Sequence, residues 1–324
     1  MATLETAPAQ SRPASPAPTA AIATEGLTKR FGRLTAVSEL TLAIRPGEVV
    51  GFLGPNGAGK TTTIRMLLGF LRPTAGRLSV LGGVPGRDTR LRRRIGYLPG
   101  DFRMDPTMTG NDLFSWFGRL RGGINRRRVE ELVERLHLEP NRPFGKLSKG
   151  NRQKIGLVQA FQHDPDVLIL DEPTSGLDPL LQHEFLELVR EASERGAAVL
   201  FSSHVLPEVE RVAARVAIIR AGKLVTIAPV DELLERARHR LALRFAGPIP
   251  PGLFAGVAGV VTAQVHGATA TIAVDGAVGP ALAAALSGLA LLGVRSAGDD
   301  LEDLFASLYG SDDGRVEERA KEGR

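Results

Sequence analysis

The chain has 324 residues, with 41 Lys and Arg against 36 Asp and Glu, and it contains no Cys. This length predicts about two domains, and the lack of Cys excludes disulfides, thiolate metal sites and a Cys nucleophile. The net charge of +5 permits contact with acidic lipid or nucleic acid but does not require it.

The two ends of the chain are predicted to carry no folded structure. Residues 1–22 are rich in Pro, Ala, Ser and Thr, and they lack the apolar stretch of a signal peptide, so we expect a disordered tail. Residues 311–324 are mostly charged or small and are expected to fray.

A glycine-rich loop is the first motif that carries chemistry. Residues 54–61 fit the phosphate-binding pattern G-x-x-x-x-G-K-[ST]. The apolar run 49–53 predicts a buried strand before it, and residues 62–71 predict an amphipathic helix after it. This order gathers backbone N–H groups at the positive end of a helix dipole, where phosphate binds. Lys60 is expected to contact the β- and γ-phosphates, and Thr61 to ligate Mg²⁺. The predicted nucleotide-binding residues here are Gly54, Pro55, Asn56, Gly57, Ala58, Gly59, Lys60, Thr61 and Thr62.

Two carboxylates follow a second apolar run. Residues 167–170 read Val-Leu-Ile-Leu, as expected for a central parallel strand, and Asp171 and Glu172 come directly after it. Open α/β sheets bind ligands at the carboxyl ends of their strands. Asp171 suits a Mg²⁺ ligand, and Glu172 suits the activation of a water for attack on the γ-phosphate. Such a strand end is common in proteins, and the phosphate loop upstream is what favours the functional interpretation.

A histidine follows the next predicted strand, 197–201. His204 could bond the γ-phosphate or the attacking water, because its strand is expected beside that of Asp171. A single histidine is more often structural, so this residue alone does not decide between the two interpretations.

These motifs, in this order, resemble the ATP-binding subunit of an ABC transporter over residues 23–235. Residues 147–154 resemble the signature sequence of that family, whose usual form begins Leu-Ser-Gly-Gly-Gln. Lys149 replaces the first glycine, and Asn151 replaces the glutamine. Residues 175–178 resemble the D-loop, His204 matches the switch histidine, and Phe31 matches the aromatic residue that stacks on adenine.

The resemblance implies an α/β fold with a RecA-like core, an antiparallel β portion near the N-terminus and a helical insert at about residues 101–160. It also implies that the signature of one protomer faces the phosphate loop of another, with two ATP molecules between them. A homodimer is expected more than a heterodimer. The implied nucleotide contacts outside the phosphate loop are Phe31, Ser148, Gly150, Asn151 and Asp178, the implied catalytic residues are Glu172 and His204, and the implied Mg²⁺ ligands are Thr61 and Asp171.

One position departs from the family in a way that affects the metal. Residues 95–99 resemble the lead-in to the Q-loop, but Gly100 stands where a glutamine normally follows. Asp101 comes next, and its carboxylate is a good ligand for a hard cation. Either the glycine lets Asp101 swing into the metal shell, or the contact is absent and a water replaces it.

Residues 236–310 predict a small α+β accessory domain with the strand and helix order βαββαβ, which suggests a ferredoxin-like fold. The expected elements are strand 241–245, helix 252–258, strands 260–265 and 268–274, helix 280–287 and strand 289–297. A final amphipathic helix is predicted at 301–309. This extension resembles that of drug- and antibiotic-efflux ATPases of the daunorubicin- and bacitracin-resistance type.

The sequence therefore predicts the ATPase subunit of an exporter, with ATP and Mg²⁺ as cofactors and a separate membrane-spanning permease as partner. Its expected place is the cytoplasmic side of the cell membrane, as a peripheral subunit. The main alternative is a soluble ABC-type translation factor at the ribosome, but that class has two such cassettes and this chain has one phosphate loop. A chromosome- or repair-type ABC ATPase needs a long coiled coil, for which too few residues separate Lys60 from Leu147.

Three further segments bear on possible partners: the basic clusters, an uncharged stretch and an apolar helical stripe. The basic clusters 90–94 and 126–128 lack interleaved aromatic residues, so we expect no nucleic acid partner. Residues 276–294 are uncharged, but glycines and a proline break them, which favours a helix followed by a strand over a membrane span. Within 111–120, Leu113, Trp116, Phe117 and Leu120 form an apolar stripe of the kind that is more often core than interface, and Phe114 lies at its edge. The resemblance implies that this region receives the coupling helix of the permease, so Phe114 is expected either on that docking surface or in the core.

Overall fold

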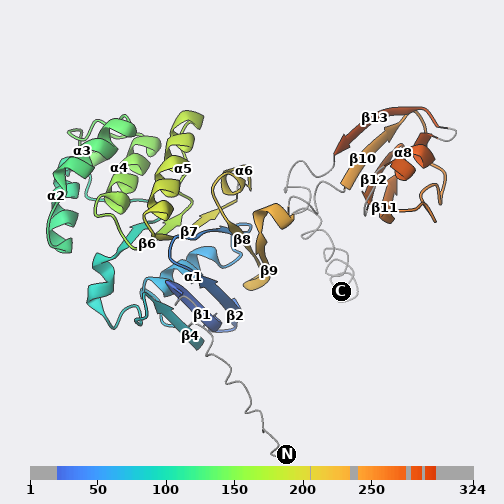
Figure 1. The fold of residues 1–324 in the computed structure, drawn as a ribbon. Helices are drawn as coiled ribbons and strands as arrows, with labels where there is room; N and C mark the ends of the chain where they lie inside the picture. The colour runs from blue at the N-terminus through green and yellow to red at the C-terminus, as the bar shows by residue number, and fades with distance from the viewer. Residues whose placement is uncertain (1–19, 205, 234–239, 275–278, 287–288, 297–324) are drawn as a thin grey trace, which may run out of the picture.

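A computed structural model of the chain describes residues 20–204, 206–233, 240–274, 279–286 and 289–296 (Figure 1). The predicted helix 301–309, the tail 311–324 and residues 1–19 of the N-terminal tail lie outside the described residues. The predicted domain boundary at residue 235 also falls outside them. Within the described part of the chain, no helix is both long enough and apolar enough to cross a bilayer.

The chain begins with a three-stranded antiparallel sheet of order β2-β1-β4. Its strands are β1 (Ile22–Phe31), β2 (Leu34–Ile44) and β4 (Ala75–Val80). Burial alternates along β2, as expected for a sheet with one face on the core. The predicted antiparallel portion near the N-terminus is confirmed.

A six-stranded sheet of order β5-β6-β7-β3-β8-β9 forms the centre of the larger folded part of the chain, before residue 234. Its strands are β3 (Val49–Leu53), β5 (Ile95–Leu98), β6 (Val167–Asp171), β7 (Ala198–Ser203), β8 (Arg215–Arg220) and β9 (Lys223–Pro229). All neighbours run parallel except β8 and β9. Every residue of β3, β6 and β7 is buried, which explains their continuous apolar runs.

This sheet separates two hydrophobic cores. Along β3, Val49 and Leu53 belong to one core and Val50 and Phe52 to the other, because successive side chains point to opposite faces. The first core also contains side chains of α5 (Pro179–Glu194) and of the helical insert. The second contains side chains of α1 (Lys60–Leu67) and of the antiparallel sheet.

The helical insert lies between β5 and β6 in the chain (Figure 1). It consists of α2 (Gly110–Arg121), α3 (Arg126–Arg135), the short 3-10 helix η2 (Phe144–Lys146) and α4 (Lys149–Phe161). The 3-10 helix η1 (Thr89–Arg93) precedes β5. Thr109 starts α2 with a capping box, in which its side chain and that of Asp112 bond each other's backbone N–H groups.

The expected place of Phe114 on the docking surface is wrong. Its side chain is 1% exposed and lies in the core of the insert, together with Leu113. Trp116 and Leu120 are instead 44% and 56% exposed. The buried side of α2 is formed by Leu113, Phe114 and Gly118, with Phe117 half-buried among them. Trp116 and Leu120 lie at the edge of this side, so the centre of the buried face is displaced from the apolar stripe toward Phe114.

The C-terminal region forms a four-stranded antiparallel sheet of order β11-β12-β10-β13. Its elements are β10 (Arg240–Phe245), β11 (Val260–His266), β12 (Thr269–Val274), α8 (Gly279–Leu286) and β13 (Leu291–Ser296). It has a core of its own, which includes Leu243, Phe254 and Ile272. The strands agree with the predicted ferredoxin-like order, but the predicted helix at 252–258 is wrong, since residues 251–256 form turns.

Candidate active site

The loop 54–59 leads from β3 into α1, which begins at Lys60. Gly57 and Gly59 have positive φ values of 81° and 109°, a region that glycine adopts without steric cost. A Cβ on Gly54 would lie 2.4 Å from the Ile219 carbonyl oxygen, and one on Gly59 would lie 2.6 Å from that of Ala36. Close packing therefore requires glycine at positions 54 and 59, whereas at position 57 the positive φ favours it.

Lys60 points back across the loop. Its ammonium group donates to the carbonyl oxygens of Gly54 at 2.5 Å and Pro55 at 3.3 Å. It also lies 3.5 Å from Glu172 Oε1, although Lys60 is only 6% exposed. A buried cation at a helix N-terminus adds its charge to the unpaired N–H groups there, and both favour an anion.

Asp171 lies at the carboxyl end of β6 and is 4% exposed. Its Oδ2 accepts from the Thr61 hydroxyl at 2.9 Å, and its Oδ1 accepts from the Ser202 hydroxyl at 2.6 Å. The carboxylate and the Thr61 hydroxyl are hard oxygen donors, the type that Mg²⁺ prefers. The donor set at this point therefore fits a Mg²⁺ ion that also contacts phosphate.

Glu172 has a left-handed backbone with φ of 49°, a conformation that costs a non-glycine residue about 1–3 kcal/mol. Its N–H donates to the Ser202 carbonyl and hydroxyl oxygens at 3.2 and 3.0 Å. Its Oε2 lies 2.6 Å from His204 Nδ1. Its Oε1 is buried and accepts no hydrogen bond within the described part of the chain. Backbone strain, and a buried carboxylate oxygen whose neighbour is the Lys60 ammonium group 3.5 Å away without a hydrogen bond, are typical of a functional site.

These side chains share a cleft of 540 Å³. Its wall is formed by the phosphate loop, the start of α1 and the carboxyl ends of the strands. The residues that line it are Ala36, Pro55, Asn56, Gly57, Gly59, Lys60, Thr61, Thr62, Arg65, Tyr97, Pro99, Gly100, Asp101, Asp171, Glu172, Ser175 and His204. The structure thus brings together the predicted phosphate, metal and water-activating residues.

The predicted signature residues lie elsewhere. Ser148 caps α4, where its hydroxyl accepts from the Asn151 N–H at 3.3 Å, and Asp178 caps α5 in the same way with Leu181 at 3.0 Å. Gly150 follows in the first turn of α4. None of these described residues lines the cleft of their own chain.

Phe31 also lies apart from the cleft lining. It is 46% exposed at the end of β1, and the Lys29 ammonium group sits 5.0 Å from the centre of its ring. An exposed aromatic face with a cation beside it remains accessible to a stacking partner.

Gly100 lies next to the Asp171 carboxylate, whereas the Asp101 side chain is exposed. A Cβ on Gly100 would lie 3.7 Å from the Asp171 carboxylate, so a longer side chain at this position would reach the predicted metal site. Asp101 is 70% exposed and forms an ion pair with Arg103 at 2.6 Å. The hydrogen bond from Arg103 lowers the pKa of Asp101. The predicted contact of Asp101 with the metal would require this pair to break.

Three residues of the site were not predicted. Ser202 bridges Asp171 and the Glu172 backbone, and the Ser-Ser-His end of its strand was a signal that could have revealed it. Tyr97 and Arg65 line the cleft. Burial raises the pKa of Tyr97 to about 12, helped by the Asp171 charge. Neither Tyr97 nor Arg65 stood in a pattern that pointed to the site.

Comparison with known proteins decides the family. The profile described as ABC transporter matches residues 37–175. The chain is 38% identical over 219 residues to the Nod factor export ATP-binding protein I of Ralstonia nicotianae. The aligned region covers 66% of this chain and 68% of that protein. The chain belongs to the ABC transporter ATP-binding family.

Further comparisons agree. This ABC ATPase is 38% identical over 232 residues to the bacitracin transport ATP-binding protein BcrA of Bacillus licheniformis, covering 69% of the chain and 75% of the relative. Among solved structures, the ATP binding subunit of an ABC transporter superposes with a TM-score of 0.63 at 29% identity, covering 66% of this chain and 92% of that one. The predicted family and fold class are confirmed, and the chain is an ATPase subunit of an ABC transporter.

Proposed function

We propose that this chain hydrolyses ATP with Mg²⁺ to drive export of an antibiotic or other small molecule through a separate membrane-spanning permease. The observation that carries the proposal is the cluster of Lys60, Thr61, Asp171 and Glu172 at one edge of the sheet. The export and transport functions named for the relatives from Ralstonia nicotianae and Bacillus licheniformis support the direction and the kind of cargo.

The residues of the cleft divide the work of hydrolysis. Lys60 and the loop N–H groups hold the phosphates, and Thr61 with Asp171 would hold Mg²⁺, which offsets charge on the transferred phosphoryl group. Glu172 Oε1 accepts the proton of the attacking water. His204, 2.6 Å from the other oxygen, keeps that carboxylate oriented. Ser202 and the left-handed backbone fix where Glu172 points.

The signature residues complete the site of a second protomer. Ser148, Gly150 and Asn151 surround an exposed helix N-terminus and do not face the cleft of their own chain. When they face the γ-phosphate of ATP bound to the partner protomer, they add hydrogen-bond donors to it. These hydrogen bonds are lost when the γ-phosphate leaves. ATP thereby favours the closed dimer and hydrolysis favours the open one, because a ligand shifts an equilibrium only through such differential contacts.

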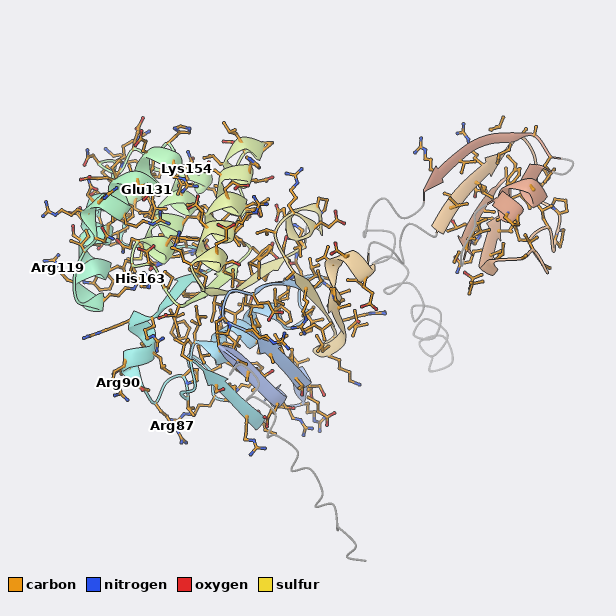
Figure 2. The ribbon with its side chains drawn as sticks, in the orientation of Figure 1. Arg87, Arg90, Arg119, Glu131, Lys154 and His163 are labelled. Atoms are coloured by element: carbon orange, nitrogen blue, oxygen red, sulfur yellow. The ribbon has the colours of Figure 1, made fainter. Side chains whose placement is uncertain are left out.

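A groove of 540 Å³ beside η1 and α2 supports a permease as partner. Its floor is apolar, with Phe70 and Leu120 60% and 56% exposed, and no carboxylate lines it among the described residues. Arg90, labelled in Figure 2, lies on η1 and lines the groove. The residues that line it are Leu68, Phe70, Thr89, Arg90, Arg92, Arg93, Ile95, Tyr97, Phe117, Leu120 and Arg121. An amphipathic helix with acidic residues, on the cytoplasmic side of the permease, fits this surface.

The experiment pairs this chain with a candidate permease, a membrane protein that has no ATP site of its own. The two are co-expressed in a drug-sensitive host, and growth is measured against a panel that includes bacitracin and daunorubicin. We expect resistance to at least one compound with the wild-type chain and none with Glu172→Gln, at equal protein levels. Resistance that is unaffected by Glu172→Gln would contradict the proposed function.

A further inference from the structure

The first turns of α4 touch the loop that carries Glu172. Gln153 is 3% exposed, and its amide nitrogen donates to the carbonyl oxygens of Pro173 at 2.9 Å and Glu172 at 3.3 Å. These two bonds join the signature helix to the backbone of the residue that activates water. A buried amide that spans two elements holds both in one arrangement.

The Glu172 backbone needs such support because its φ of 49° is strained. On one side, Ser202 holds its N–H. On the other, its carbonyl oxygen accepts from Gln153 and from the Ser175 N–H at 3.2 Å. The position of the Glu172 carboxylate therefore depends on α4 as well as on the sheet.

Two further contacts join the start of α4 to the loop after Glu172; we call this contact region, from residues 149–153 to residues 172–176, the junction. A Cβ on Gly150 would lie 2.6 Å from the Gly176 carbonyl oxygen, so the two turns pack backbone to backbone. Lys149 donates from Nζ to the Ser175 hydroxyl at 2.8 Å, and its stem lies against Gly176. The signature pattern usually has glycine where this chain has Lys149, so this bond is a feature of its own sequence.

We propose that Gln153 and Lys149 are positioning residues that tie the signature turn to Glu172 of the same protomer. The inference rests on the proposed function, in which that turn holds the nucleotide of the partner. Docking of the signature on one nucleotide then fixes the water-activating carboxylate at the other. The two ATP sites are coupled through this junction, with Gln153 as its buried part and Lys149 as its exposed part.

Gln153→Met keeps the size of the side chain and removes both hydrogen bonds. We expect kcat of the full-length chain for ATP to fall by about tenfold or more, since small displacements of a catalytic group are costly. The Hill coefficient for ATP should fall toward 1, while the Kd for ATP stays unchanged. Gln182→Met is the matched control, because Gln182 is also part-buried and donates to one carbonyl oxygen, that of Leu177, at 3.2 Å.

Lys149→Met tests the exposed part of the junction without a risk to folding. We expect a lower Hill coefficient at unchanged Kd for ATP, and recovery in Lys149→Arg. Lys154→Met is the control, since Lys154 lies on the same helix (Figure 2) and donates to the His137 carbonyl oxygen at 3.3 Å. A Hill coefficient in Lys149→Met equal to that of wild type overturns the role of Lys149.

The outcomes separate the two proposals. If wild type hydrolyses ATP cooperatively and folded Gln153→Met keeps both kcat and the Hill coefficient, the coupling is wrong and the proposed function stands. If Gln153→Met does not fold, the Lys149 series decides. If wild type does not hydrolyse ATP, both proposals are wrong.

Discussion

The cleft at the phosphate loop and the turn at the start of α4 differ in how their polar groups are satisfied. In the cleft, Lys60 and Asp171 are 6% and 4% exposed, and their partners come from the phosphate loop, α1 and β7 of the same chain. At the turn, Ser148 and Lys149 are exposed, and the Ser148 hydroxyl bonds only locally, to Asn151. The cleft is assembled within one chain, whereas Ser148 and Lys149 at the turn are exposed on the surface.

This difference teaches that one chain holds two unlike halves of a site. Under the proposed function, the cleft binds ATP and activates water, and the turn completes the cleft of another protomer. Each half can be damaged alone, so variants that affect only one of them test the comparison.

Glu172→Gln should have the largest effect, because it removes the proton acceptor and leaves the phosphate contacts in place. We expect turnover to fall by about 10²–10⁴-fold, with ATP still bound and the chain accumulated as a dimer. Turnover by steady-state assay and mass by light scattering with ATP measure this. Normal turnover in Glu172→Gln would remove Glu172 from the chemistry.

A pair of α2 variants separates core from surface. Phe114→Ala should lower the free energy of unfolding by about 3–5 kcal/mol, since it leaves a cavity, as measured by urea denaturation. Leu120→Glu, on the exposed side of α2, should leave stability unchanged and reduce co-purification with the permease. Permease binding that survives Leu120→Glu, or that Phe114→Ala abolishes without destabilising the chain, would contradict this assignment.

The sequence identified the cleft well because phosphate chemistry constrains it locally. A run from Gly54 to Thr61 and an apolar strand that ends in Asp171 and Glu172 leave few alternatives. The buried face of α2 was harder to predict. Leu113, Trp116, Phe117 and Leu120 form an apolar stripe with Phe114 at its edge, and only packing in three dimensions decides which of these side chains are covered. The contacts of Gln153 join residues far apart in sequence, and no local pattern revealed them. Ser202 had only the Ser-Ser-His end of its strand as a signal.

His163 lies outside both half-sites (Figure 2) and should affect stability alone. Burial, aided by the nearby Arg121 charge, lowers the pKa of His163 to about 3. The unfolded chain takes up a proton near pH 6.5 and the folded chain does not, so stability is lost as the pH falls below 6.5. Between pH 7 and pH 5, protonation of His163 in the unfolded chain should lower the free energy of unfolding by about 2 kcal/mol.

His163→Gln should remove that part of the pH dependence, because glutamine can still donate to the Ile95 carbonyl oxygen and does not titrate. Urea denaturation of both proteins at pH 7 and pH 5 measures the difference. An equal loss of stability in wild type and variant would show that other groups cause it.

Asp101→Ala should have the smallest effect. Because Asp101 is exposed and paired with Arg103, we expect the Mg²⁺ concentration for half-maximal turnover to change by no more than about threefold. A rise of about tenfold, partly reversed by adding Gly100→Gln, would instead make Asp101 a metal ligand.

The most direct test of the two-halves account mixes two inactive variants. Lys60→Ala damages the cleft and keeps the signature turn, while Ser148→Arg blocks the turn and keeps the cleft. Neither protein alone has an intact composite site, but a mixed dimer has one. We predict that the mixture regains ATP turnover, up to about a quarter of wild type if the protomers pair at random. A mixture no more active than its separate components would contradict the claim that the two halves meet between protomers.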